Sequence, residues 1–154
     1  MFVTRTFSKV HGMAGLRMGY AIGHPDTLKA IAAHKTGSTN VVTLAAAAAS
    51  IQDKAHIAKQ RDQIRGSLEA TTRVFADMGF KATDSQANFI LVDVKQPAKD
   101  FRDACEKMGV AIGRDFPPLT THARITIGTQ EEMRTANDVF KKVLSASKTT
   151  TAGA

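Results

Sequence analysis

Residues 6–20 have the sequence TFSKVHGMAGLRMGY, and this stretch decides how the whole chain is interpreted. It places Lys9 after a strand-like segment, flanks it with the hydroxyls of Thr6 and Ser8, and puts Arg17 eight residues further along. Hydroxyl groups and an arginine fork bind phosphate, and glycines let the backbone approach a ligand closely. The stretch therefore predicts a phosphate site with an amine beside it, although the same residues also fit a strand, a flexible turn and a surface lysine.

The composition around this stretch restricts the class of protein. The chain has 154 residues and is 43% hydrophobic, which is enough for one ordinary domain with a core. The only cysteine, Cys105, cannot form an intramolecular disulfide and is expected in the core, and no Cys/His cluster has the spacing of zinc ligands. No apolar run is long enough for a membrane helix, and the first ten residues do not resemble a secretory signal. We expect a cytoplasmic protein with no metal and no membrane partner.

The charge balance favours anionic small molecules over nucleic acid. The chain has 21 basic and 14 acidic residues, a formal net charge of +7. Its lysines and arginines are spread along the chain, and one tyrosine with no tryptophan leaves few platforms on which bases could stack. We therefore expect no nucleic-acid partner, and a basic surface that suits phosphates and carboxylates.

Hydrophobic spacing predicts alternating strands and helices. The alanines of residues 45–49 are expected to form buried helix because alanine is the best helix former, and Gly79 is expected to end that helical stretch. In chain order the predicted elements are strands at 1–8 and 17–22, a helix capped by Asp26 and ending near Gly37, one long helix or two in tandem at 43–78, a strand at 88–94, a helix from Pro97, a short strand at 110–112, a strand at 123–127 and a helix at 130–144.

These elements divide unevenly along the chain. We expect a boundary near residue 50, because the two strands before it have no evident sheet to join, whereas residues 51–146 form a self-contained α+β unit. Residues 147–154 have no apolar face and are predicted to form a disordered tail.

The segment TFSKVHGMAGLRMGY resembles the active-site lysine segment of the fold type I aminotransferases of classes I and II, and is most similar to their histidinol-phosphate aminotransferase branch. Residues 88–92, 109–112 and 124–129, followed by Glu131 and Glu132, continue the resemblance in the family's order. It implies an α/β fold that is the C-terminal part of this transferase fold. Residues 1–50 would be a remnant of the large-domain sheet, followed by a long helix and an α+β small domain at 51–146.

The resemblance also implies a pyridoxal 5′-phosphate cofactor and a role for particular residues. Lys9 would be the catalytic residue, forming a Schiff base with the cofactor and then moving the proton of the substrate Cα. Thr6, Ser8 and Arg17 would hold the cofactor phosphate. Arg124 would pair with the substrate α-carboxylate through two parallel hydrogen bonds.

Two further residues are candidates for substrate binding. The resemblance puts Arg114 near the substrate side chain, although a surface arginine fits equally well. Asn88 either faces the edge of the site or makes local backbone bonds at the start of a strand. His11 has no expected role. The implied substrates are an amino acid and a 2-oxo acid, and the implied assembly of the complete enzyme is a homodimer.

Other interpretations remain open from the sequence. One is a truncated, non-catalytic remnant or interaction module, because the family's remaining cofactor ligands come before the lysine. Another is a pyridoxal phosphate-dependent decarboxylase, against which Arg124 argues because it would hold the carboxylate that such an enzyme removes. We also expect residues 1–50 to leave apolar surface uncovered, which favours self-association.

Overall fold

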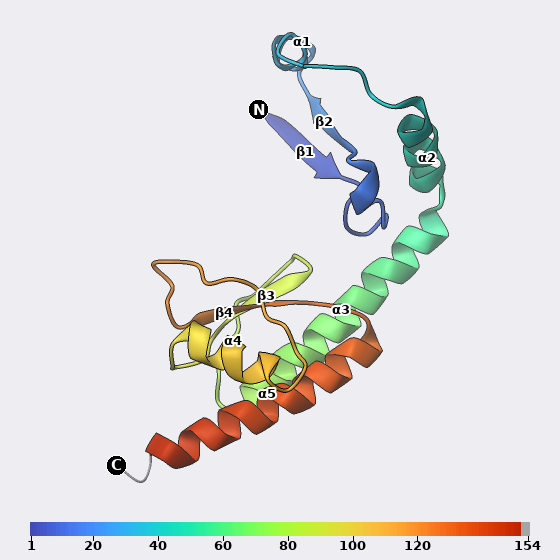
Figure 1. Ribbon diagram of the computed structural model, residues 1–154. Helices are drawn as coiled ribbons and strands as arrows, with labels where there is room; N and C mark the ends of the chain where they lie inside the picture. Colours follow the sequence, from blue (N-terminus) through green and yellow to red (C-terminus); the bar gives the residue numbers. More distant parts are fainter. Residues whose placement is uncertain (152–154) are drawn as a thin grey trace. The chain divides into compact units, whose positions relative to one another are not determined.

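A computed structural model describes residues 1–151 of the chain, with side chains as far as residue 146. The chain divides into two compact units, of which the first is Met1–Arg61 and the second begins at Asp62. The division lies later in the chain than the expected boundary near residue 50, and falls inside a long helix. Figure 1 shows that both units combine helices with a pair of strands.

The first unit begins with an antiparallel pair of strands, β1 (Phe2–Thr6) and β2 (Gly19–Gly23). Both strands were predicted, and they pair with each other rather than with a larger sheet. A Cβ atom on Gly19 would lie 2.8 Å from the carbonyl oxygen of Arg5, so the close pairing requires glycine at that position. The connecting loop contains the short 3-10 helix η1 (Ala14–Leu16).

Three helices follow the strands. They are α1 (Pro25–Ala32), α2 (Val41–Gln52) and α3 (Lys54–Asp77), and α3 begins in the first unit and continues into the second. The stretch predicted as one helix or two in tandem is therefore two helices. Asp53 separates them, and its carboxylate accepts a hydrogen bond from the backbone N–H of His56 at 2.9 Å.

The predicted cap of α1 is wrong by two residues. His24 is the N-cap, and its Nδ1 accepts a hydrogen bond from the backbone N–H of Asp26 at 3.3 Å. Pro25 is the first helical residue, where its fixed φ angle and missing N–H cost nothing. Asp26 instead lies in the first turn of the helix, where its negative charge interacts favourably with the positive end of the helix dipole.

The alanine run of α2 is only partly buried, which corrects the prediction of buried helix. Ala47 is buried, whereas Ala45, Ala48 and Ala49 are exposed. Thr43 is the other buried residue of this helix, one turn before Ala47. Because residues four apart lie on one face of a helix, α2 buries a single narrow stripe.

The second unit packs helices against another antiparallel pair of strands, β3 (Phe89–Asp93) and β4 (His122–Thr126). The remaining helices are α4 (Ala98–Glu106) and α5 (Gln130–Thr151). In both strands burial alternates along the sequence, so one face of the pair points into the core. Figure 1 shows α5 beside the second half of α3.

Aromatic rings from three helices occupy the core of this unit. Phe140 of α5 lies 5.4 Å from Phe75 of α3 and 5.8 Å from Phe101 of α4, measured between ring centroids. Ile90 and Val92 of β3 complete the centre and are fully buried. Burial of rings of this size contributes strongly to the free energy of folding.

Two glycines end helices of this unit in the left-handed conformation. Gly79 follows α3 with φ +82°, and Gly109 follows α4 with φ +83°. After Gly79, the N–H of Phe80 donates to the carbonyl of Phe75 at 2.9 Å, which satisfies an end carbonyl of the helix. The predicted stop at Gly79 is therefore confirmed.

The short strand predicted at Val110–Ile112 is absent. The N–H of Val110 donates to the carbonyl of Cys105 at 3.0 Å and so belongs to the end of α4. Among the described residues, no backbone hydrogen bond joins Ala111 or Ile112 to β4. After α3 the element order is thus strand, helix, strand, helix.

The last helix is longer than predicted. α5 continues past Leu144, its expected end, to Thr151, and so includes part of the expected tail. Residues 152–154 of that tail lie outside the described residues. In the part of the chain that the structure describes, no helix is long and apolar enough to cross a membrane.

Candidate functional site

Lys9 lies just beyond the end of β1, in a turn that is closed by its own carbonyl group. The N–H of Gly12 donates to the carbonyl of Lys9 at 2.8 Å, and Gly12 has a φ of +66°, which glycine adopts without strain. The N–H of Met13 donates to the carbonyl of Phe7 at 2.9 Å and closes the wider loop. The Lys9 side chain is exposed at the surface of this loop.

The two predicted hydroxyls contact each other beside Lys9. The Thr6 hydroxyl donates to the Ser8 Oγ at 2.9 Å, and the Thr6 Oγ1 accepts from the Ser8 backbone N–H at 3.0 Å. This local bonding fixes both side chains at the end of β1.

Arg17 lies opposite Ser8 across the end of the strand pair. Thr6 pairs with Gly19, and the N–H of Phe7 donates to the carbonyl of Met18, so the next residues outward are Ser8 and Arg17. Arg17 has a φ of +52°, a left-handed conformation that is uncommon outside glycine. Its Nη1 donates to the carbonyl of Ala14 at 2.9 Å.

Arg124 occupies the middle of β4, in the second unit. Its Cζ lies 4.3 Å from the centre of the Phe89 ring and 5.7 Å from that of Phe116. Its Nε is buried and, in the described structure, has no hydrogen-bond partner. A cation within cation–π distance of two rings is held in place without using its hydrogen bonds, so its N–H groups remain suited to an anion.

Arg114 shares one of these rings. Its Cζ lies 4.6 Å from the centre of the Phe116 ring, and its Nη1 donates weakly to the carbonyl of Asp115 at 3.4 Å. The Asp115 carboxylate accepts a hydrogen bond from Nη1 of Arg102 at 2.8 Å. The ring of Phe116 therefore has both predicted substrate arginines, Arg114 and Arg124, within cation–π distance.

Asn88 extends the β3–β4 pair by one residue. Its carbonyl accepts a hydrogen bond from the N–H of Ile127 at 2.8 Å. The half-buried residue directly precedes Phe89, whose ring contacts Arg124.

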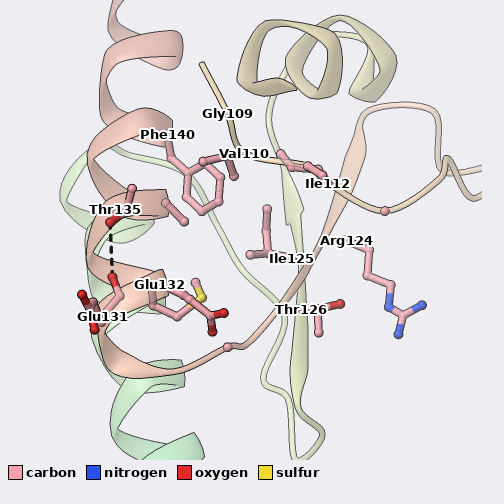
Figure 2. Close-up of a pocket in the computed structure, with 15 residues that line it drawn as sticks. Gly109, Val110, Ile112, Arg124, Ile125, Thr126, Glu131, Glu132, Thr135 and Phe140 are labelled. Carbon is pink, nitrogen blue, oxygen red and sulfur yellow. Dashed lines mark hydrogen bonds between the residues drawn. The ribbon is translucent and has the colours of Figure 1, made fainter. Parts of the chain in front are cut away.

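A pocket of about 560 Å³ opens beside Arg124, between β4, the segment 109–113 and α5. Figure 2 shows the apolar side chains of Val110, Ile125 and Phe140 near its middle, with Glu131 and Glu132 on the side opposite Arg124. The pocket combines an apolar centre with charges of both signs, which suits a small zwitterionic or anionic molecule.

The predicted site residues thus form two groups, one in each unit. Thr6, Ser8, Lys9 and Arg17 belong to the first unit, and Asn88, Arg114 and Arg124 belong to the second.

Two aromatic residues of the site were not predicted. The Phe89 ring contacts Arg124, and the Phe116 ring contacts Arg114. The sequence did contain a signal for them, because Phe89 directly follows Asn88 and Phe116 lies two residues after Arg114.

Cysteine and metal chemistry have no candidate site among the described residues. Burial raises the pKa of the Cys105 thiol to about 12, so the thiol stays protonated, and its full burial confirms the prediction of a core residue. No three His, Cys, Asp or Glu side chains of the described part gather so that they could hold a metal ion.

Comparisons with known proteins match nearly the whole chain to aminotransferases. The sequence model of the family described as "Aminotransferase class I and II" matches residues 1–140. Histidinol-phosphate aminotransferase 1 of Nitrosococcus oceani is 34% identical over 94% of the chain, and the histidinol-phosphate aminotransferase of Gluconacetobacter diazotrophicus is 35% identical over 94%. The chain spans 40% and 42% of the length of these two relatives.

A solved structure extends the likeness to the fold. The crystal structure of histidinol-phosphate aminotransferase from Sinorhizobium meliloti in complex with pyridoxal 5′-phosphate superimposes with a TM-score of 0.80 at 27% identity. The match covers 94% of this chain and 41% of that one.

Proposed function

The chain belongs to the aminotransferase class I and II family, and from this premise we propose that it takes part in moving an amino group between an amino-acid-like substrate and a 2-oxo acid. We propose pyridoxal 5′-phosphate as its cofactor, which the Sinorhizobium meliloti relative binds. The observation that carries the proposal is the end of the β1–β2 pair, where an exposed lysine follows two hydroxyls in mutual contact.

The donors at this end of the strand pair suit the cofactor phosphate. Thr6 and Ser8 present hydroxyls that can turn their protons toward an anion. Arg17 uses one of its five N–H donors for the carbonyl of Ala14, and a phosphate needs only two of the others. We propose that these three side chains hold the phosphate.

Lys9 is the proposed catalytic residue. When bound, pyridoxal phosphate withdraws electrons from the substrate Cα and makes its proton easier to remove. The Nζ of Lys9 would hold the aldehyde carbon of the cofactor at rest, and would take the Cα proton once the substrate amine has replaced it. The turn closed by Gly12 fixes the backbone from which this side chain extends.

Arg124 is the proposed ligand of the substrate α-carboxylate. Its buried Nε has no partner in the described structure, and its guanidinium is supported by the rings of Phe89 and Phe116. A planar guanidinium forms two parallel bonds to a carboxylate, which fixes the carboxylate's orientation as well as its position.

The finer proposal concerns the substrate side chain. Arg114 shares the Phe116 ring with Arg124, so the two cations are neighbours. A substrate with a second anionic group, such as the phosphate of histidinol phosphate, would use both. We propose Asn88 at the edge of the same site because it directly precedes Phe89.

We also propose a homodimer located in the cytoplasm. Exposed apolar side chains such as Val41 and Val42 at the start of α2 favour a protein partner. The lone, buried Cys105 suits a reducing compartment.

Reductive trapping tests the role of Lys9. The full chain is incubated with pyridoxal 5′-phosphate, reduced with borohydride and mapped by peptide mass spectrometry. We expect the mass gain on the peptide that contains Lys9, and its loss in Lys9→Ala. Lys29→Ala, which removes an exposed lysine of α1, is the matched control and should trap normally. Equal labelling of Lys9→Ala, or labelling scattered over surface lysines, contradicts the proposal.

A non-catalytic interaction module is the second candidate. It is favoured by the first unit, in which only three described residues are buried: Phe7, Thr43 and Ala47. Trapping at Lys9 without any conversion of an amino acid to its 2-oxo acid would favour this candidate.

A further inference from the structure

His11 lies in the same turn as Lys9 and is bonded to a helix. The turn begins at Lys9 and is closed by the N–H of Gly12, which places His11 two residues after the lysine. The Nδ1 of His11 lies 2.7 Å from the Oγ of Ser50, which belongs to the last turns of α2. The imidazole also packs against Phe7, with 4.7 Å between ring centroids.

This contact differs from the other hydrogen bonds of the loop. The bonds of Gly12 to Lys9, of Met13 to Phe7 and of Arg17 to Ala14 all lie within the loop. In the part of the chain that the structure describes, the His11–Ser50 bond is the one that joins the loop to a helix. It is partly buried, which limits competition from water.

An aromatic contact adds to the same attachment. Phe7 is 1% exposed, and its ring also lies 5.6 Å from that of Tyr20, so His11 contacts a ring that is itself buried. Either protonation state of His11 can bond to Ser50, because a hydroxyl donates to neutral Nδ1 and accepts from the protonated form. The attachment therefore does not require one tautomer.

We infer that His11 and Ser50 are positioning residues, which hold the turn of Lys9 against α2 and so fix the direction of its amine. The inference rests on the proposed function of Lys9. The phosphate ligands Thr6, Ser8 and Arg17 make no hydrogen bond to either residue in the described structure. Loss of the attachment should therefore slow the reaction of the amine without weakening phosphate binding.

Two measurements on the full chain test the inference. The first is hydrogen exchange at the backbone amides of Gly12 and Met13. Ser50→Ala and His11→Phe should each speed this exchange about fivefold, the effect of losing one ordinary hydrogen bond, while amides of the second unit stay unchanged. His11→Phe keeps a ring against Phe7 and so tests the hydrogen bond rather than the packing.

The second measurement is the rate of borohydride-trapped labelling at Lys9 over a range of pyridoxal 5′-phosphate concentrations. We expect both variants to lower the rate at saturation about fivefold and to leave the half-saturating concentration unchanged. His11→Asn places a polar atom where Nδ1 lies and should restore part of the rate. Ser38→Ala, in an exposed loop, is the matched control and should behave as the unmodified chain.

The outcomes separate the two proposals. Normal exchange and normal labelling rates in both Ser50→Ala and His11→Phe overturn the inference. Faster exchange with unchanged labelling also overturns it, because the contact then has a structural role only. No labelling at Lys9 in the unmodified chain overturns the proposed function, and the exchange rates still decide whether His11 and Ser50 hold the turn.

Discussion

At the scale of single residues, Arg124 combines burial with unused hydrogen-bonding capacity. Its Nε is buried without a partner in the described structure, and its guanidinium lies over the Phe89 ring. Arg124→Lys keeps the charge but loses the second parallel bond to a carboxylate. We expect this variant to bind a 2-oxo acid such as 2-oxoglutarate at least about tenfold more weakly, as judged by NMR shifts of the Phe89 ring during titration.

The control for this experiment is Arg134→Lys, which changes an exposed arginine of α5. It should bind as the unmodified chain does. Equal affinity of the Arg124→Lys variant and the unmodified chain would show that the orphaned Nε does not take part in anion binding.

At the scale of elements, the start of α5 depends on a reciprocal pair of hydrogen bonds. The Thr129 hydroxyl oxygen accepts from the N–H of Glu132 at 3.2 Å, and the Glu132 carboxylate accepts from the N–H of Thr129 at 2.7 Å. This capping box stabilises the helix. A Cβ on Gly128 would lie 2.6 Å from Oε2 of Glu132, so glycine leaves room for the carboxylate.

The same pair predicts a pH dependence of stability. The backbone and hydroxyl hydrogen bonds from Thr129 hold the pKa of Glu132 below its usual value of 4.5. A carboxyl whose pKa is lowered by folding stabilises the folded state above its unfolded pKa, and this contribution is lost as the pH falls through the lowered value. Glu132→Gln should therefore reduce the loss of stability between pH 6 and pH 3, measured by urea unfolding.

Thr129→Ala provides the companion variant. It should lower the free energy of unfolding by about 1 kcal/mol at pH 7, the usual effect of removing a threonine cap. Thr120→Ala changes an exposed threonine before β4 and should have a smaller effect. If Thr129→Ala and Thr120→Ala lower stability equally, the capping box does not stabilise α5.

The elements that the sequence predicted well are those with local causes. Gly79 ends α3 because a left-handed residue is required there, and each of the four strands contains β-branched or aromatic residues. The misses depend on tertiary context. Val110–Ile112 has strand composition but lacks backbone pairing with β4 in the described structure, and the Ala45–Ala49 run has helix propensity that says nothing about which side is covered.

In the candidate site, too, the features with a local sequence signal were predictable and the long-range contacts were not. The family and the fold class follow from the segment around Lys9, and the comparisons confirm both. The link between His11 and Ser50 spans 39 positions, so no local pattern indicates it. Phe89 and Phe116 are close in sequence to Asn88 and Arg114, but only the folded structure shows that both rings lie near Arg124.

At the scale of the whole molecule, the first unit exposes many large apolar side chains. Ile22 is 61% exposed, Val41 78% and Val42 71%. Large apolar side chains exposed in this way favour association, so we expect the chain to self-associate in solution. Val41→Lys combined with Val42→Glu should lower the mean mass measured by light scattering, since the substitutions place charges at the start of α2.

Leu119→Lys, which adds a charge at an exposed position of the second unit, is the control and should leave the association unchanged. A monodisperse monomer for the unmodified chain would contradict the prediction.

The position of the division between the units has an evolutionary consequence. The peptide bond between Arg61 and Asp62 in α3 separates the proposed cofactor ligands from the proposed substrate ligands along the chain. A recombination event inside that helix would exchange one set of ligands and leave the other intact. Substrate preference in such a lineage would then be inherited separately from the proposed cofactor-binding lysine and its neighbours.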